Sequence, residues 1–97
     1  MRIIYMSYVI TKYSFDKAKL FNLTIKVSKN PLKKLDVYRD NIFIGSIGDI
    51  MYNDYSHYCI IYNKEYGDKR KILYRNRHKL NADVKYSKQW LALNLLW

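Results

Sequence analysis

The sequence predicts an α+β domain, a small antiparallel sheet with a β-hairpin followed by two or three helices. The chain has 97 residues, 49% of them apolar or aromatic, which suits one domain with a modest core over residues 1–97. Apolar residues alternate with polar ones in the first half, as in strands. From Asp54 onward, the apolar spacing becomes helical.

The first segment, residues 1–22, opens with an apolar run over 3–10. This run is short, carries Tyr and Ser, and lacks a small-residue cleavage site, so it predicts a strand rather than a signal peptide. We expect 1–22 to form an extra strand or a docking arm. The apolar run over 90–97 has eight residues, against about 20 for a membrane span. We therefore expect no membrane partner.

The next segment alternates strictly. Leu23, Ile25 and Val27 are separated by single polar residues, the pattern of a strand with one buried face. Asn30 and Pro31 then predict a turn.

A β-hairpin is expected around Asp40-Asn41, because two β-rich runs, 35–39 and 42–44, flank these residues. Asn and Asp tolerate the left-handed backbone of such a turn. The expected cross-strand pairs are Arg39 with Ile42, Tyr38 with Phe43, and Val37 with Ile44. Gly45 and Gly48 are expected to end the second strand, with the glycines of 45–48 in a turn.

Two helices are expected after the hairpin, a short one capped by Asp54 and a longer one over 64–80. Gly67 inside the longer helix costs about 1 kcal/mol relative to Ala, so either the helix breaks there or another element packs closely. At 100° per residue, the expected core stripe contains Tyr62, Tyr66, Leu73 and Leu80, with Lys69 beside it. The expected basic face contains Lys64, Asp68, Lys71, Arg75 and His78.

A final helix is expected after Ser87, which is a suitable N-cap. Residues 90–97 are apolar on nearly all sides, so this helix must insert into the core or into an interface.

The charge is strongly positive, +10 at pH 7, and unevenly distributed. Residues 1–33 carry seven cations and one anion, 34–63 two and four, and 64–80 seven and two. A genome rich in A and T explains part of the lysine excess, because lysine codons are rich in A. Arginine codons are mostly not rich in A and T, yet three of the five arginines cluster in 64–80. This distribution predicts a polyanionic partner or an acidic protein surface.

The helix over 64–80 is therefore the expected phosphate-binding element, since guanidinium groups suit bidentate phosphate contacts. Two alternatives stay open. The cations could form a solvated face with internal pairs such as Glu65 with Lys69. Alternatively, Arg70 or Arg77 could clamp Asp49, Asp54 or the terminal carboxylate. The expected nucleic-acid-binding residues are Lys64, Lys69, Arg70, Lys71, Arg75, Arg77, His78 and Lys79.

Aromatic residues are interleaved with these cations, which is typical of surfaces that stack unpaired bases. The same spacing is typical of a core of amphipathic rings, and the sequence favours this core interpretation. The tyrosines concerned are Tyr52, Tyr55, Tyr58, Tyr62, Tyr66 and Tyr74.

Catalytic signals are weak. Cys59 is the only cysteine, so no disulfide or paired-thiolate zinc site is expected. His57 lies two residues from Cys59, and residues at that spacing point to different faces of a helix or strand, so a nucleophilic pair is not expected. We expect no enzyme activity, metal, cofactor or small-molecule substrate.

From about residue 24 to the end, the chain resembles a family of small basic proteins encoded by tailed bacteriophages and by large DNA viruses of eukaryotes. The matching segments are 28–31, 36–40, 44–48, 52–55, 65–70, Leu73-Tyr74, Arg77-His78, Trp90 and Leu95-Leu96-Trp97. The chain departs from the family in its longer N-terminal stretch and over 81–85, where the family is more basic. The resemblance implies a viral protein, in the virion or the host cytoplasm, and supplies no mechanism.

The function expected from the sequence is binding to the phosphate backbone of nucleic acid without sequence specificity, through the helix over 64–79 and the N-terminal lysines. One alternative is a virion structural protein, a minor capsid or cement protein, that docks on other virion proteins through its termini. A further alternative is an inhibitor of an acidic host protein.

Overall fold

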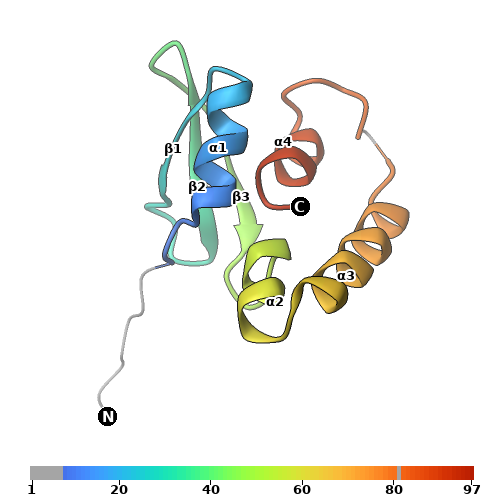
Figure 1. The fold of residues 1–97 in the computed structure, drawn as a ribbon. Helices are drawn as coiled ribbons and strands as arrows, with labels where there is room; N and C mark the ends of the chain where they lie inside the picture. Colours follow the sequence, from blue (N-terminus) through green and yellow to red (C-terminus); the bar gives the residue numbers. More distant parts are fainter. Residues whose placement is uncertain (1–7, 81) are drawn as a thin grey trace.

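The computed structural model describes residues 8–80 and 82–97, which form a three-stranded antiparallel sheet and four helices. Three of the helices follow the sheet, so the predicted α+β class is confirmed (Figure 1). In chain order the elements are α1 (Lys12–Leu20), β1 (Thr24–Val27), β2 (Lys33–Arg39), β3 (Ile42–Asp49), α2 (Tyr55–Ile61), α3 (Lys64–Arg77) and α4 (Lys88–Leu95).

Helix α1 corrects the prediction of an extra strand for residues 12–20. Thr11 caps the helix by accepting a 3.3 Å hydrogen bond from the Ser14 amide. Ser14 and Ala18 are buried, and the Ser14 hydroxyl donates to the Leu95 carbonyl at 2.7 Å. This helix therefore packs inside its own domain instead of serving as a docking arm. The predicted strand over 3–10 falls largely outside the described residues.

The sheet has the order β1-β2-β3, and the turn predicted at Asp40-Asn41 is present. Both residues have positive φ, 51° and 65°, as a tight hairpin turn requires. The predicted pairs Arg39 with Ile42 and Tyr38 with Phe43 are confirmed. The third is wrong, because an irregularity between Val37 and Tyr38 shifts the register and pairs Val37 with Gly45.

Strand β3 also continues through the glycines that were expected to end it. Ile47 pairs with Leu35, and both side chains are buried, so core packing extends the strand to Asp49. Gly48 has a φ of 81°, and a Cβ there would lie 2.7 Å from Leu96 Cδ1. Glycine thus permits close approach between β3 and the C-terminal segment.

Helices α2 and α3 form a pair beyond the end of β3 (Figure 1). Asp54 caps α2 as predicted, and α3 ends at Arg77 rather than at Leu80. Gly67 does not break α3. A Cβ at this position would lie 2.3 Å from Cys59 Sγ, so close packing against α2 explains the glycine.

The predicted core stripe of α3 is wrong. Leu73 is 42% exposed and Leu80 82% exposed, whereas Gly67 is buried and Tyr74 is half-buried about a third of a turn further round the helix. The helix is oriented by the Gly67 contact and by a ring stack between Tyr74 and Trp97. The free energy gained from these contacts exceeds the cost of leaving a few aliphatic side chains exposed to water.

Helix α4 inserts into the core, as its composition predicts. Ser87 caps it by accepting a 3.1 Å hydrogen bond from the Trp90 amide. The helix packs against α1 and β3. The buried cluster contains Ala18, Leu23, Ile25, Leu35, Val37, Ile47, Leu91, Leu95, Leu96 and Trp97. No helix in the described part of the chain has the length and apolarity needed to cross a membrane.

Candidate functional site

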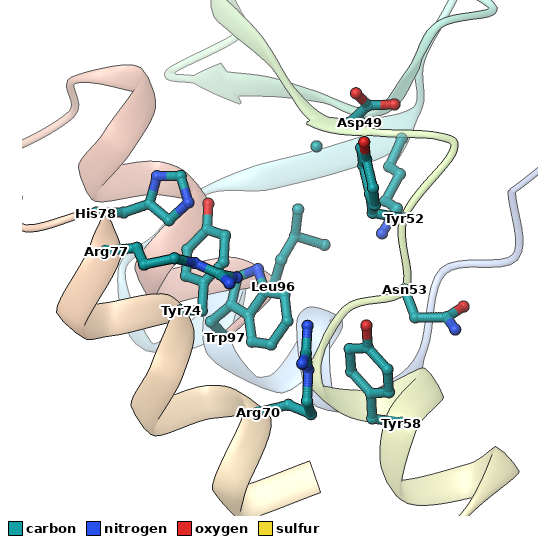
Figure 2. Close-up of a pocket in the computed structure, with 12 residues that line it drawn as sticks. Asp49, Tyr52, Asn53, Tyr58, Arg70, Tyr74, Arg77, His78, Leu96 and Trp97 are labelled. Carbon is teal, nitrogen blue, oxygen red and sulfur yellow. The ribbon is translucent and has the colours of Figure 1, made fainter.

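A cleft of about 470 Å³ lies between α3, the loop that joins β3 to α2, and the C-terminal residues Leu96 and Trp97. Figure 2 shows arginine and tyrosine side chains reaching it from α3, His78 just after that helix, and Tyr52 on the opposite side. Asn53 also lines the cleft, and its side chain is turned outward in this view. The size is within the range of about 300–1,000 Å³ that is usual for ligand clefts.

One side of the cleft is a stack of aromatic rings. Tyr74 lies parallel to Trp97, with ring centroids 4.2 Å apart and an interplanar angle of 8°. His78, the residue that caps the end of α3, stacks on Tyr74 with ring centroids 4.1 Å apart and an interplanar angle of 25°. Burial raises the pKa of Tyr74, so its hydroxyl is neutral at physiological pH. The stack gives the cleft a rigid aromatic wall.

Arg70 enters the cleft from α3 without an anionic partner. Its guanidinium carbon lies 5.1 Å from the centre of the Tyr58 ring, which restrains the group by a cation–π contact. Its Nε is buried and has no hydrogen-bond partner among the described residues. No ion pair joins Arg70 to a carboxylate in residues 8–80 and 82–97.

Arg77 and His78 line the same cleft, two helical turns after Arg70. Neither makes an ion pair with a described carboxylate. Asp49 also lines the cleft, but its Oδ1 accepts a 2.9 Å hydrogen bond from the Met51 amide. The predicted clamp of Arg70 or Arg77 on Asp49, Asp54 or the terminal carboxylate is therefore absent from the described structure.

Two other predicted cations have internal partners. Lys64 forms a 2.8 Å ion pair with Asp68, instead of the expected pair between Glu65 and Lys69. Arg75 donates a 3.2 Å hydrogen bond from Nη2 to the Leu93 carbonyl, which ties α3 to α4.

Lys71 is directed inward. Its Nζ lies 4.6 Å from the Tyr55 ring centroid and donates to the Tyr13 hydroxyl at 3.3 Å. Burial lowers the pKa of Lys71, and the nearby Arg75 lowers it further. Lys69 and Lys79 are exposed and do not line the cleft. Of the eight predicted residues, the cleft brings together Arg70, Arg77 and His78.

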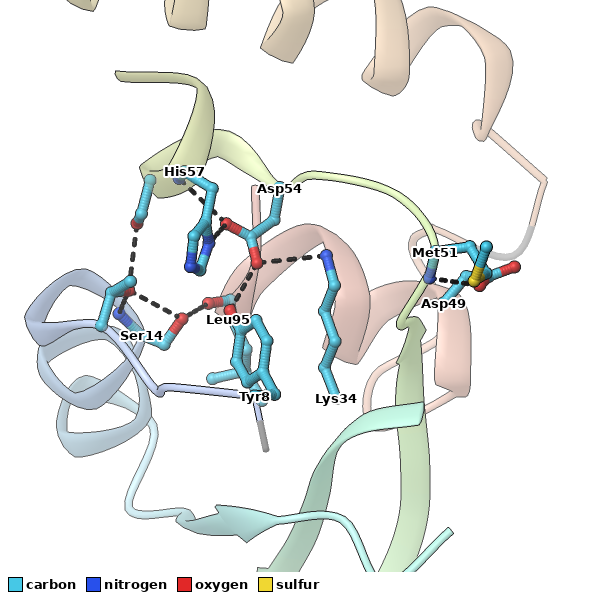
Figure 3. Close-up of polar contacts among 10 residues, drawn as sticks. Tyr8, Ser14, Lys34, Asp49, Met51, Asp54, His57 and Leu95 are labelled. Atoms are coloured by element: carbon cyan, nitrogen blue, oxygen red, sulfur yellow. Dashed lines mark hydrogen bonds and ion pairs between the residues drawn. The ribbon is translucent and has the colours of Figure 1, made fainter. Parts of the chain in front are cut away.

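A buried polar network lies behind the cleft, centred on Asp54, which is 1% exposed (Figure 3). Its Oδ2 lies 3.3 Å from Lys34 Nζ and also accepts a hydrogen bond from the Tyr8 hydroxyl. Its Oδ1 lies 2.8 Å from His57 Nδ1 and accepts a 3.2 Å hydrogen bond from the His57 amide. The network holds β2 and residue 8 against the start of α2.

The charges in this network compensate each other. Burial by itself raises the pKa of Asp54, but Lys34 and the hydrogen bonds from Tyr8 and His57 lower it by more, so the net pKa lies below its usual 3.8. Burial lowers the pKa of Lys34, and Asp54 opposes this effect. Lys34 also lines the cleft, but its charge is already paired and is not free for a ligand.

The described residues do not assemble a nucleophilic pair. His57 Nδ1 contacts Asp54, while Cys59 packs against Gly67. No group of three or more His, Cys, Asp or Glu side chains among the described residues could hold a metal ion.

The tyrosines for which the sequence allows core packing or base stacking differ in their exposure. Tyr55, Tyr58 and Tyr74 pack against the core, whereas Tyr52 and Tyr62 are 70% and 58% exposed.

Sequence reasoning missed the contribution of the Trp97 ring and of Asn53 to the cleft, although it had named Asp49 as a possible partner of Arg70 or Arg77. Only the aromatic residues near the cations signalled it, and no sequence pattern joins residue 97 to residue 52.

Comparison with protein-family models, with curated proteins and with solved structures finds no match to this chain.

Proposed function

We propose that the protein binds nucleic acid without catalysing a reaction, and that Arg70, Arg77 and His78 hold the phosphate groups. The observation that supports this proposal is their convergence on one cleft without an anionic partner among the described residues. A guanidinium group forms bidentate hydrogen bonds with phosphate oxygens, so two of them can hold one or two adjacent phosphates.

The overall electrostatics favour the same partner. The net charge of +10 attracts polyanions, and residues 64–80, which include α3, carry seven cations against two anions. Contacts to phosphate position a protein but carry no sequence information. We therefore propose binding without sequence specificity.

The salt dependence of binding tests this proposal. We expect log affinity for a short oligonucleotide to fall linearly with log salt concentration. In the variant with Arg70→Gln and Arg77→Gln, the slope should become shallower by about 0.7–0.9 for each phosphate that the protein no longer neutralises. The matched control is Lys69→Gln, which removes one charge next to Arg70 but outside the cleft. An equal change of slope per charge in the control and in the cleft variant would show that only net charge matters.

The viral origin and the location in the virion or host cytoplasm stay predictions from the resemblance. Leu91, Leu95 and Leu96 are at most 2% exposed. Residues 90–97 therefore offer these leucines to the protein's own core and not to other virion proteins. Mass spectrometry of purified virions would test packaging directly. Inhibition of an acidic host protein would use the same basic cleft, and the oligonucleotide titration above separates that function from nucleic-acid binding.

A further inference from the structure

The cleft has a chemically different wall opposite α3. Tyr52, on the loop after β3, is 70% exposed and makes no ring contact with another described aromatic side chain (Figure 2). Its backbone is fixed, because the Tyr52 amide donates to the Asp49 carbonyl at 3.2 Å and the Met51 amide donates to the Asp49 carboxylate at 2.9 Å. The ring is thus presented to the cleft from a held turn.

On the α3 side of the cleft, Arg70 has no negatively charged partner among the described residues. Arg70 is half-buried against Tyr58, and its guanidinium makes no hydrogen bond or ion pair with a described residue. A partly desolvated cation without a counter-charge is unfavourable in the free protein. An anion bound in the cleft removes this cost, and Arg77 brings a second guanidinium group to the same cleft.

Two polar residues line the cleft on the same side as Tyr52. Asp49 has a second carboxylate oxygen besides the one that accepts from the Met51 amide, and Asn53 follows Tyr52 on the loop, so this side carries groups that can hydrogen-bond the edge of a base. An exposed ring, polar groups and an unpaired arginine match the three parts of a nucleotide that proteins contact, which are the base face, the base edge and the phosphate.

We infer that the cleft accepts one unpaired nucleotide, with its phosphate at Arg70 and Arg77 and its base against Tyr52. This inference rests on the proposed function and deepens it. A base inside a duplex is stacked and paired, and must be extruded at a free-energy cost before it can enter a cleft. The protein therefore binds single strands or unpaired loops in preference to duplex.

The test compares two labelled probes, a short oligothymidylate and a duplex of the same length, by fluorescence anisotropy. The variants are Tyr52→Leu, which removes the ring, and Tyr52→Phe, which keeps it. Tyr62→Leu is the matched control, because Tyr62 is also exposed but does not line the cleft. Circular dichroism spectra establish that each variant is folded.

We expect tighter binding to the single strand, and a loss of about tenfold or more in that affinity for Tyr52→Leu. Tyr52→Phe and Tyr62→Leu should retain the affinity, and thymidine 5′-monophosphate should displace the probe better than inorganic phosphate does. Equal binding to both probes, unaffected by Tyr52→Leu, would overturn the inference and leave the proposed function standing. Binding to neither probe would overturn both.

Discussion

Replacing Asp54 with Asn isolates the charge of the buried network from its shape. Asn is as good an N-cap as Asp, so the hydrogen bond to the His57 amide can be kept. The variant removes the anion that faces Lys34, whose side chain is 5% exposed. Lys34 must then either stay charged in a buried site or lose its proton.

The expected cost is large. Removing one partner of a buried ion pair destabilises a protein by about 3–5 kcal/mol, because the other charge is left uncompensated. The total stability of a domain of this size is about 5–15 kcal/mol. Since 1 kcal/mol shifts Tm by about 4–8 °C at this length, Asp54→Asn should lower Tm by about 12 °C or more.

Urea and thermal unfolding, followed by circular dichroism, measure this effect. The matched variant carries Lys34→Met as well as Asp54→Asn, and should regain most of the lost stability, because an apolar replacement of a buried pair is often neutral. A single variant within about 1 kcal/mol of the wild type would refute the conclusion that the pair is buried and mutually dependent.

The same carboxylate predicts a dependence on pH. The folded-state pKa of Asp54 lies below its usual value of 3.8. Its contribution to stability is therefore complete above that value and is lost as pH falls through the folded-state pKa. The wild type should lose more stability than Asp54→Asn when the pH is lowered from about 6 to about 3.

Two further variants test the packing. Gly67→Ala places a Cβ 2.3 Å from Cys59 Sγ and should destabilise the protein by about 1–3 kcal/mol, despite the better helix propensity of Ala. Adding Cys59→Ala should reverse part of this loss in the same urea titration. Ser87→Ala removes the acceptor of the Trp90 amide and should cost about 1 kcal/mol, measured as a shift of the urea midpoint without a change in slope.

The elements that the sequence predicts well are those set by local chemistry. The turn at Asp40-Asn41 needs residues that tolerate positive φ, and the caps at Asp54 and Ser87 need a side-chain acceptor. The register beyond Tyr38 was not predictable, because the irregularity there depends on packing across the sheet. Helix α1 was missed, although Thr11 supplies a side-chain cap like those of the other helices and two lysines lie in its last turn.

The orientation of α3 shows what periodicity leaves out. An apolar stripe predicts the buried face only when apolar burial decides the packing. Here Gly67 and the stacked ring of Tyr74 decide it, and long cationic side chains such as Lys71 lie over aromatic rings on the inner side. The candidate site depends on that orientation, so the sequence supplied Arg70 and Arg77 but not the cleft between them and Tyr52.

The most direct test of the central claim is a map of where nucleic acid contacts the folded chain. Amide and side-chain NMR signals of the labelled protein would be followed during titration with a short oligothymidylate. Binding in the cleft predicts that the signals that shift cluster at Arg70, Arg77, His78, Tyr52 and the Trp97 indole. Shifts confined to the lysines of α1, or no shifts at all, would contradict it.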